Sequence, residues 1–298
     1  MFDFIKKDKF ESQDSNYLNQ KSSFMKFTFL PYVSENMRLR NSKWKKTVWD
    51  ISGKQIFLLD NFFISEEIKK LSEFSKKASF SRKSYGSIEG IEAGESPALS
   101  MDSKERWNFF FNPPESIFLI YEWFSYFSAI FDVEVSLMPW ELFDGVVSTP
   151  ATIANKVYQV SEESMLKGIH KDYNPKEKLP FVIPNLYDSI FPHIGNFENG
   201  QQGKPYMLSL LLYSTEDNFL PSFRAGTVFL SEDKKTKKES NCSNGGLVLF
   251  EGDIDHSLAM SSIPAGIDTW RVSYVYKIIL NPRKENSNIK LYLKNYFN

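Results

Sequence analysis

The stretch GGLVLFEGDIDHSLAMSSIPAGIDTWRVSYVYKIIL, residues 245–280, sets the architecture of the C-terminal half of the chain. A glycine pair precedes the apolar run LVLF, which predicts a short buried strand. After a turn, His256 and a further loop, a second apolar run carries Arg271 and Ser273. Short β-rich runs separated by polar turns are typical of a β-sandwich or a barrel.

The rest of the chain fits an α+β fold with a mainly β core. Apolar residues at helical spacing predict a helix capped by Ser65 and a second helix, apolar nearly all round, at 115–131. Segments 84–104 and 233–246 are rich in turn-forming or charged residues, which predicts loops. Strands are expected at 56–59, 152–160, 206–213, 225–230, 246–250 and 271–280.

We expect a single domain, 1–298, because no internal repeat and no linker divides the chain. Its parts are an N-terminal extension, a strand with buttressing helices, a β-rich catalytic core and a C-terminal segment. Their expected bounds are 1–55, 56–135, 136–282 and 283–298.

Charge and cysteine content exclude several functional classes. The 36 basic and 37 acidic side chains leave no broad basic surface for nucleic acid. The single cysteine, Cys242, excludes an intramolecular disulfide and a thiolate-rich zinc site. The N-terminal residues lack the features of a signal peptide, and no window approaches the ~20 apolar residues of a membrane span. We therefore expect a cytoplasmic protein without a membrane partner.

Three side chains have the spacing of a metal site. His170 and Asp172 lie two residues apart in GIHKDYN, so on a strand they would face the same side. His256, from a neighbouring strand, would add a second imidazole. Two histidines and one carboxylate on one face of an ion leave other positions open, a set diagnostic of non-haem Fe(II) oxygenases.

The last strand carries a suitable anchor for a chelating co-substrate. A dicarboxylate chelator needs a cation at its far end, and a guanidinium offers a bidentate fork. Arg271, with the hydroxyl of Ser273 on the same strand face, meets this requirement.

In order and spacing, these segments resemble the Fe(II)/2-oxoglutarate-dependent dioxygenases, in particular the prolyl-4-hydroxylase-like branch. The resemblance covers about residues 55–280. The matching segments are LDNFFISEEIKKLSEF, KVYQV, GIHKDYN, MLSLLLYST, RAGTVFL, GGLVLFEGDIDH and WRVSYVYK. The resemblance implies a double-stranded β-helix, of the jelly-roll or cupin-like kind, buttressed by N-terminal helices.

The resemblance also implies roles for individual residues. His170, Asp172 and His256 would bind Fe(II) and form the catalytic centre. Arg271 and Ser273 would bind the distal carboxylate of 2-oxoglutarate. O2 is the implied second co-substrate, with ascorbate as an optional addition.

Three further positions bear on the resemblance. Tyr158, in KVYQV, matches a place where the family often has a tyrosine that contacts 2-oxoglutarate. The segment 173–205 is longer than in minimal relatives, and it contains His193, which we expect to be a loop histidine without a special role. Ala225, in RAGTVFL, stands where the family commonly has a second glycine.

The implied reaction is hydroxylation of an unactivated C–H bond, coupled to decarboxylation of 2-oxoglutarate to succinate. The carboxylate of Asp172 favours hydroxylation over halogenation, since related halogenases have a small residue there. Desaturation and ring formation use the same ligands and stay open. The expected substrate is a small molecule, such as an amino acid or a natural-product intermediate. A peptidyl-prolyl hydroxylase is the alternative.

Two other classes of protein fit parts of the pattern. One is a non-catalytic, metal-binding cupin-like module that binds or senses a ligand. The other is a cupin-type isomerase or dioxygenase that uses no oxo-acid. Neither of them needs an intact set of three ligands together with Arg271, so this arginine distinguishes the hypotheses.

Overall fold

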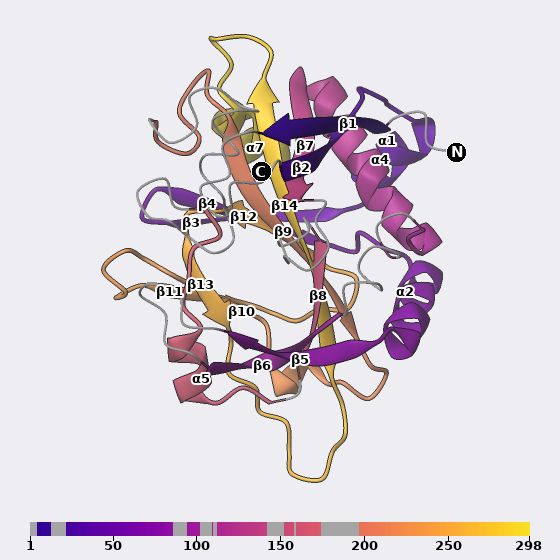
Figure 1. The fold of residues 1–298 in the computed structure, drawn as a ribbon, viewed down its shortest axis with the longest axis vertical. Helices are drawn as coiled ribbons and strands as arrows, with labels where there is room; N and C mark the ends of the chain where they lie inside the picture. Colours follow the sequence, from indigo (N-terminus) through magenta and orange to yellow (C-terminus); the bar gives the residue numbers. More distant parts are fainter. Residues whose placement is uncertain are drawn as a thin grey trace.

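The strands of the protein form one large and one small antiparallel sheet (Figure 1). The computed structural model describes residues 5–12, 22–85, 94–101, 109, 112–141, 152–157, 159–173 and 197–298. Within these ranges the large sheet has 11 strands and the small sheet has three. This is the mixed α/β architecture with a large antiparallel core that the sequence predicted.

The main path of the large sheet follows the order β1-β2-β7-β14-β9-β12-β4-β3, with β5, β6 and β8 beside it. Its strands are β1 (Ile5–Ser12), β2 (Ser22–Phe29), β3 (Lys45–Ile51), β4 (Lys54–Asp60), β5 (Phe80–Tyr85), β6 (Gly94–Met101), β7 (Val133–Glu141), β8 (Thr152–Val157), β9 (Tyr206–Thr215), β12 (Leu247–Glu251) and β14 (Arg271–Pro282).

The small sheet has the order β11-β10-β13. Its strands are β10 (Thr227–Leu230), β11 (Lys237–Ser240) and β13 (Asp255–Leu258). The described helices are α1 (Glu35–Asn41), α2 (Ser65–Lys77), α4 (Glu115–Ile130), α5 (Glu162–Lys167), α7 (Ile289–Phe297) and a short 3-10 turn, η1 (Pro221–Phe223). None of the helices in the described part of the chain is long and apolar enough to cross a membrane.

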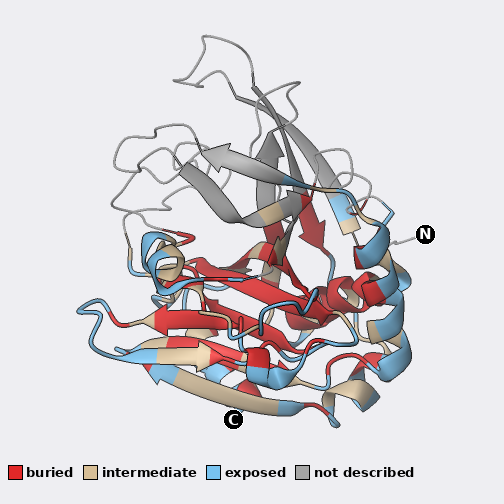
Figure 2. Ribbon diagram, turned by 90° about the horizontal axis from the view of Figure 1, so that it is seen from below, coloured by how far each residue is buried: buried red, intermediate tan, exposed pale blue. Residues whose placement is uncertain are grey.

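The central strands β9 and β14 are buried on both faces, and Figure 2 shows how the buried residues gather along the middle of the sheet. Because successive side chains of a strand alternate between faces, each strand contributes to two separate cores. Residues such as Leu212 and Tyr274 belong to one apolar cluster. Leu211, Tyr213 and Val275 belong to the other.

Helices cover one of these two faces. Tyr274 lies against α2, where its hydroxyl is 2.5 Å from Ser75 Oγ. Tyr276 lies against α4, with its ring 6.2 Å from that of Tyr121. The sequence of α4 is apolar nearly all round because the helix is buried on almost every side.

The small sheet covers the opposite, inner face. Tyr213 of β9 bridges the two sheets, since its hydroxyl lies 2.8 Å from Thr227 Oγ1 and 3.1 Å from Ser240 Oγ. Phe250 of β12 and Phe229 of β10 add an apolar contact, with ring centroids 5.0 Å apart. The two sheets therefore face each other through both polar and apolar side-chain contacts.

Most predicted elements are confirmed, but three segments differ. The expected helices and C-terminal strands are present within a few residues of their expected bounds. Within the expected N-terminal extension, 1–55, β2 pairs with β7 and β3 pairs with β4, so this segment supplies strands to the large sheet. The loop prediction for 84–104 was wrong for β6, and the loop prediction for 233–246 was wrong for β11.

The last residue of β12, Glu251, has a buried carboxylate. Glu251 is 1% exposed, and its Oε1 accepts a hydrogen bond from Gln55 N at 2.7 Å and lies 2.8 Å from Lys290 Nζ. Burial raises the pKa of Glu251 to about 7, although the charge of Lys290 opposes the shift. The folded protein therefore binds this proton more tightly than the unfolded chain does.

This shift predicts a pH-dependent stability. Between about pH 4.5 and about pH 7 the unfolded chain loses the Glu251 proton first, so the free energy of unfolding falls as the pH rises. Glu251→Gln removes this loss. The free energy of unfolding of the variant, relative to that of wild type, should rise by roughly 2–3 kcal/mol from pH 5 to pH 8. Urea unfolding at both pH values measures this difference. The exposed Glu285→Gln should keep the wild-type profile, and a Glu251→Gln profile parallel to wild type would contradict the assignment.

Candidate metal centre

Two backbone hydrogen bonds bring His170 beside His256. His170 N donates to His256 O at 3.0 Å, and His256 N donates to His170 O at 2.9 Å. In such an antiparallel pair the two side chains lie on the same face, and the imidazole centroids are 4.4 Å apart. His256 belongs to a strand, as expected, but the strand predicted for His170 and Asp172 was wrong. The bridge at His170 is isolated, and Asp172 lies in a bend.

The short helix α5 directs the chain into this bridge. Its N-cap is Ser161, whose Oγ accepts a hydrogen bond from Ser164 N, and its C-cap is Gly168. Ser257 Oγ of β13 donates to Met165 O at 2.7 Å, which ties the helix to the strand that carries His256. A Cβ at Gly168 would lie 2.8 Å from Ser257 Oγ, so this close approach favours glycine.

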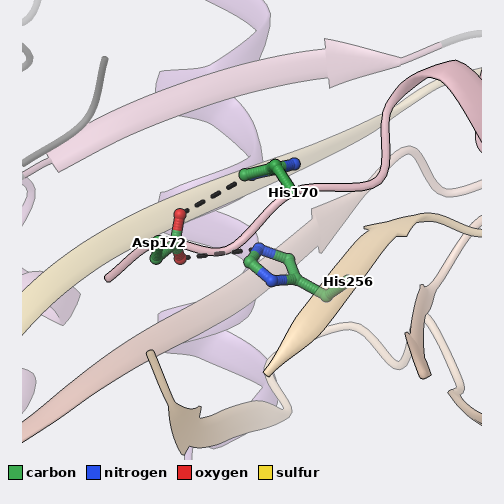
Figure 3. Close-up of side chains that lie close together, drawn as sticks. All are labelled: His170, Asp172 and His256. Carbon is green, nitrogen blue, oxygen red and sulfur yellow. Dashed lines mark ion pairs between the residues drawn. The ribbon is translucent and has the colours of Figure 1, made fainter. Parts of the chain in front are cut away.

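The three side chains named from the sequence converge on one point (Figure 3). Asp172 Oδ1 lies 3.6 Å from His170 Nε2, and Asp172 Oδ2 lies 3.5 Å from His256 Nε2. One potential ligand atom from each residue lies within 4.8 Å of the others. Two neutral nitrogens and one carboxylate oxygen at this spacing suit a divalent ion with positions left open.

The other nitrogen of each imidazole is held by the backbone. His170 Nδ1 lies 2.7 Å from Gly168 O, and His256 Nδ1 lies 2.9 Å from Ile254 O. A carbonyl only accepts hydrogen bonds, so each Nδ1 carries a proton. In the neutral ring this leaves Nε2, the nitrogen on the side of Asp172, as the one that binds a metal ion.

Burial also sets the charges at the centre. Burial lowers the pKa of His256 to about 3, so its ring is neutral at physiological pH. Burial by itself would raise the pKa of Asp172, but the positive charge of Lys277, together with the interactions with His256 and His170, holds that pKa well below its usual range. A neutral imidazole and an ionised carboxylate are the forms that bind a metal ion.

Two residues that the sequence did not single out hold Asp172. Ser209 Oγ of β9 donates to Asp172 Oδ2 at 2.7 Å, and Lys277 Nζ of β14 contacts the same oxygen. A signal for Lys277 was present, because it is the one charged residue inside the apolar run that follows Arg271. It lies six residues beyond Arg271 and thus on the same strand face.

Arg271 is fully buried and has few partners. Its Nη2 donates to Gly226 O at 3.4 Å, and the guanidinium lies 5.3 Å from the centre of the Tyr213 ring. Nε and Nη1 make no hydrogen bond with any residue that the structure describes. An uncompensated buried guanidinium is costly, so its surroundings fit an anionic ligand.

Cross-strand neighbours connect Arg271 to the strand that carries His256. Phe229 is the Cα partner of His256, and Thr227, two residues earlier on β10, is the partner of Leu258. Thr227 is therefore a diagonal neighbour of His256, and such neighbours lie about 7–8 Å apart. The hydroxyl of Tyr213 lies 2.8 Å from Thr227 Oγ1, and the ring of Tyr213 lies 5.3 Å from the guanidinium of Arg271.

The remaining expected residues divide into two groups. Ser273 is buried, on the same face of β14 as Arg271, and it is the Cα partner of Tyr213 in β9. Tyr158 and His193 lie outside the described residues, as does most of the segment 173–205.

No protein-family model matches the chain, and no curated protein matches its sequence. Among solved structures, it is similar to a prolyl-4-hydroxylase from Pseudomonas putida, with 11% identity, a TM-score of 0.37 and coverage of 77% of this chain and 93% of the other. It is also similar to a Trichoplax adhaerens prolyl hydroxylase in complex with a peptide fragment of the oxygen degradation domain of hypoxia inducible factor. Here the identity is 12%, the TM-score is 0.36, and the match covers 85% of this chain and 93% of the other.

A third similar structure is the dioxygenase for auxin oxidation 1 from Arabidopsis thaliana in a complex with 2-oxoglutarate, with 10% identity, a TM-score of 0.32 and coverage of 85% of this chain and 93% of the other. Identities and TM-scores this low carry no argument about the chemistry of this chain.

The geometry predicts one divalent-ion site per chain that depends on Asp172. Asp172→Ala removes the anionic donor, and we expect it to weaken Co(II) binding on the order of 100-fold or more. The measurement is an anaerobic Co(II) titration followed by visible absorption. Asp255→Ala, beside His256 but outside the three converging side chains, should bind like wild type. Equal binding by wild type and Asp172→Ala would contradict the site.

Proposed function

We propose that this chain is a non-haem Fe(II)/2-oxoglutarate-dependent oxygenase that hydroxylates an unactivated C–H bond. The proposal rests on two features of the described residues. One is the two-histidine, one-carboxylate set, and the other is a buried guanidinium whose Nε and Nη1 have no hydrogen-bond partner among the described residues. We also infer that the two facing sheets form a double-stranded β-helix around these residues.

Three residues would hold Fe(II) in this proposal. His170 and His256 present Nε2 atoms whose tautomer is fixed by the backbone, and Asp172 supplies the anionic oxygen. When bound, the ion with 2-oxoglutarate and O2 supplies oxidative decarboxylation to succinate and CO2 and transfers one oxygen atom to the substrate. Because Asp172 occupies a ligand position, hydroxylation is favoured over halogenation.

Arg271 would bind the distal carboxylate of 2-oxoglutarate. Its Nε and Nη1 can donate in parallel to two carboxylate oxygens, which is the geometry that a guanidinium favours. Ser273, on the same strand face, would add a hydroxyl donor. Tyr158 is a further proposed contact to 2-oxoglutarate, on the resemblance alone, and ascorbate is an optional addition to the assay.

The apolar wall would protect the centre from water. The ring of Phe250 lies 4.7 Å from that of His256, and Phe229 lies 6.4 Å away. The side chain of His170 is 38% exposed, whereas those of His256 and Asp172 are 8% and 4% exposed. The substrate would therefore approach from the side of His170.

We propose a small molecule, such as an amino acid or a natural-product intermediate, as the substrate class. A prolyl peptide is the alternative, and both belong in a screen that follows succinate release. A cupin-like module without turnover has no use for Arg271 as an anchor, because it binds no oxo-acid through a distal carboxylate. The arginine therefore favours the oxygenase.

The test is the weak visible charge-transfer band that a 2-oxo-acid produces when it chelates Fe(II). Under anaerobic conditions, wild type with Fe(II) and 2-oxoglutarate should show the band. His256→Ala should lose it because a ligand is missing. Arg271→Leu should need at least about tenfold more 2-oxoglutarate, since charged hydrogen bonds contribute about 1.5–3 kcal/mol.

Arg283→Leu is the matched control, because this arginine lies just beyond β14 and contacts Asp132 and Ser128. It should behave like wild type. A wild-type protein that binds Fe(II) but shows no band with 2-oxoglutarate would contradict the proposal and favour a cupin-like protein that uses no oxo-acid.

A further inference from the structure

Lys277 is a buried cation that contacts the carboxylate of the centre. Its Nζ lies against Asp172 Oδ2 and 3.4 Å from Ser209 Oγ, and its side chain is 12% exposed. Ser209 donates to the same carboxylate oxygen at 2.7 Å. Lys277 and Ser209 are Cα partners in the β14–β9 register, so one cross-strand pair supplies both contacts.

The two oxygens of Asp172 are therefore not equivalent. Oδ2 receives the hydroxyl of Ser209 and the ammonium of Lys277, which together engage about two lone-pair directions. Each oxygen also faces one imidazole, Oδ1 that of His170 at 3.6 Å and Oδ2 that of His256 at 3.5 Å, but Oδ1 contacts neither Ser209 nor Lys277. An oxygen whose lone pairs are already engaged is a poor donor to an ion, so Oδ1 remains as the donor.

We propose that Lys277, together with Ser209, is a positioning residue that holds Asp172 as a one-oxygen ligand and places a positive charge beside the ion. The inference rests on the proposed function and deepens it. A carboxylate that offers one oxygen occupies one coordination position and leaves the others for the co-substrate and O2. A carboxylate free to bind through both oxygens would occupy one position more.

The charge of Lys277 has opposite effects on the two ligands of the centre. A divalent ion with two neutral imidazoles and one carboxylate carries a single net positive charge, and the ammonium doubles the local charge. Lys277 repels the ion itself, which weakens metal binding. It attracts a dianion such as 2-oxoglutarate, which strengthens chelation at the loaded centre.

The experiment measures both affinities in the same variants. Mn(II) binding is followed by the electron paramagnetic resonance signal of the free ion, and 2-oxoglutarate binding to the Mn(II)-loaded protein is followed by calorimetry. We expect Lys277→Met to bind Mn(II) several-fold more tightly and 2-oxoglutarate about tenfold more weakly than wild type. Loss of a merely structural residue would weaken both, because it would disorder Asp172.

Three further variants separate charge from structure. Lys277→Arg keeps the charge and should restore both affinities towards wild type. Lys277→Gln removes the charge but keeps a hydrogen-bond donor, so it repeats the test if the methionine variant does not fold. Ser209→Ala removes only the hydroxyl and should weaken Mn(II) binding a few-fold without the opposite change in 2-oxoglutarate binding.

The outcomes distinguish the two proposals. Opposite changes in Lys277→Met or Lys277→Gln support the role of Lys277. If the wild-type protein binds Mn(II) and 2-oxoglutarate but these variants change neither affinity, or lose both, the role of Lys277 is overturned while the proposed function stands. If Mn(II)-loaded wild type does not bind 2-oxoglutarate, the proposed function fails, and the inference fails with it.

Discussion

Polar side chains on the inner face of β9 and β14 are enclosed between two sheets, and each must find a partner there. Burying a charge without compensation costs far more than burying an apolar side chain gains. Lys277 and Ser209 both contact the carboxylate of Asp172. The hydroxyl of Tyr213 contacts those of Thr227 and Ser240. Arg271 is paired only in part, through one long hydrogen bond. Among the described residues, Nε and Nη1 of Arg271 have no partner while the carboxylate of Asp172 is paired, and this contrast makes the interior a candidate site.

The inner face is enclosed because successive side chains of β9 and β14 alternate between the two faces of the large sheet. Strands β9 and β14 place large apolar residues under the helices and smaller or polar residues under the small sheet. Covering the inner face with β10, β11 and β13 brings His256 over the carboxylate. The reciprocal backbone hydrogen bonds between His170 and His256 then fix the third ligand. The position of each proposed ligand thus depends on backbone pairing as well as on its own side-chain contacts.

The sequence predicted elements whose patterns are strong and local. The helices that begin at Ser65 and Glu115 and the apolar runs of β9, β12 and β14 are all of this kind. Strand β3 was missed because most of its side chains are partly or fully exposed and give no clear alternation. Strand β13 is short and mixes polar with apolar residues, so a strand was expected at His256 but its bounds were not.

For the site, the sequence predicted which three residues converge but not the backbone conformation that brings them together. His170, Asp172 and His256 converge as expected, but through an isolated bridge and a bend. The contacts of Ser209 and Lys277 with Asp172 join residues that are far apart in the chain. They depend on the register of β14 against β9, which a single sequence does not specify.

The most direct test of the proposed site is a crystal structure of the protein with Mn(II) and 2-oxoglutarate, with the ion located by its anomalous scattering. We predict one ion bound by His170 Nε2, His256 Nε2 and a single oxygen of Asp172, with the distal carboxylate of 2-oxoglutarate on Arg271. An ion bound elsewhere, or an oxo-acid that chelates the ion but leaves Arg271 without a carboxylate partner, would contradict it.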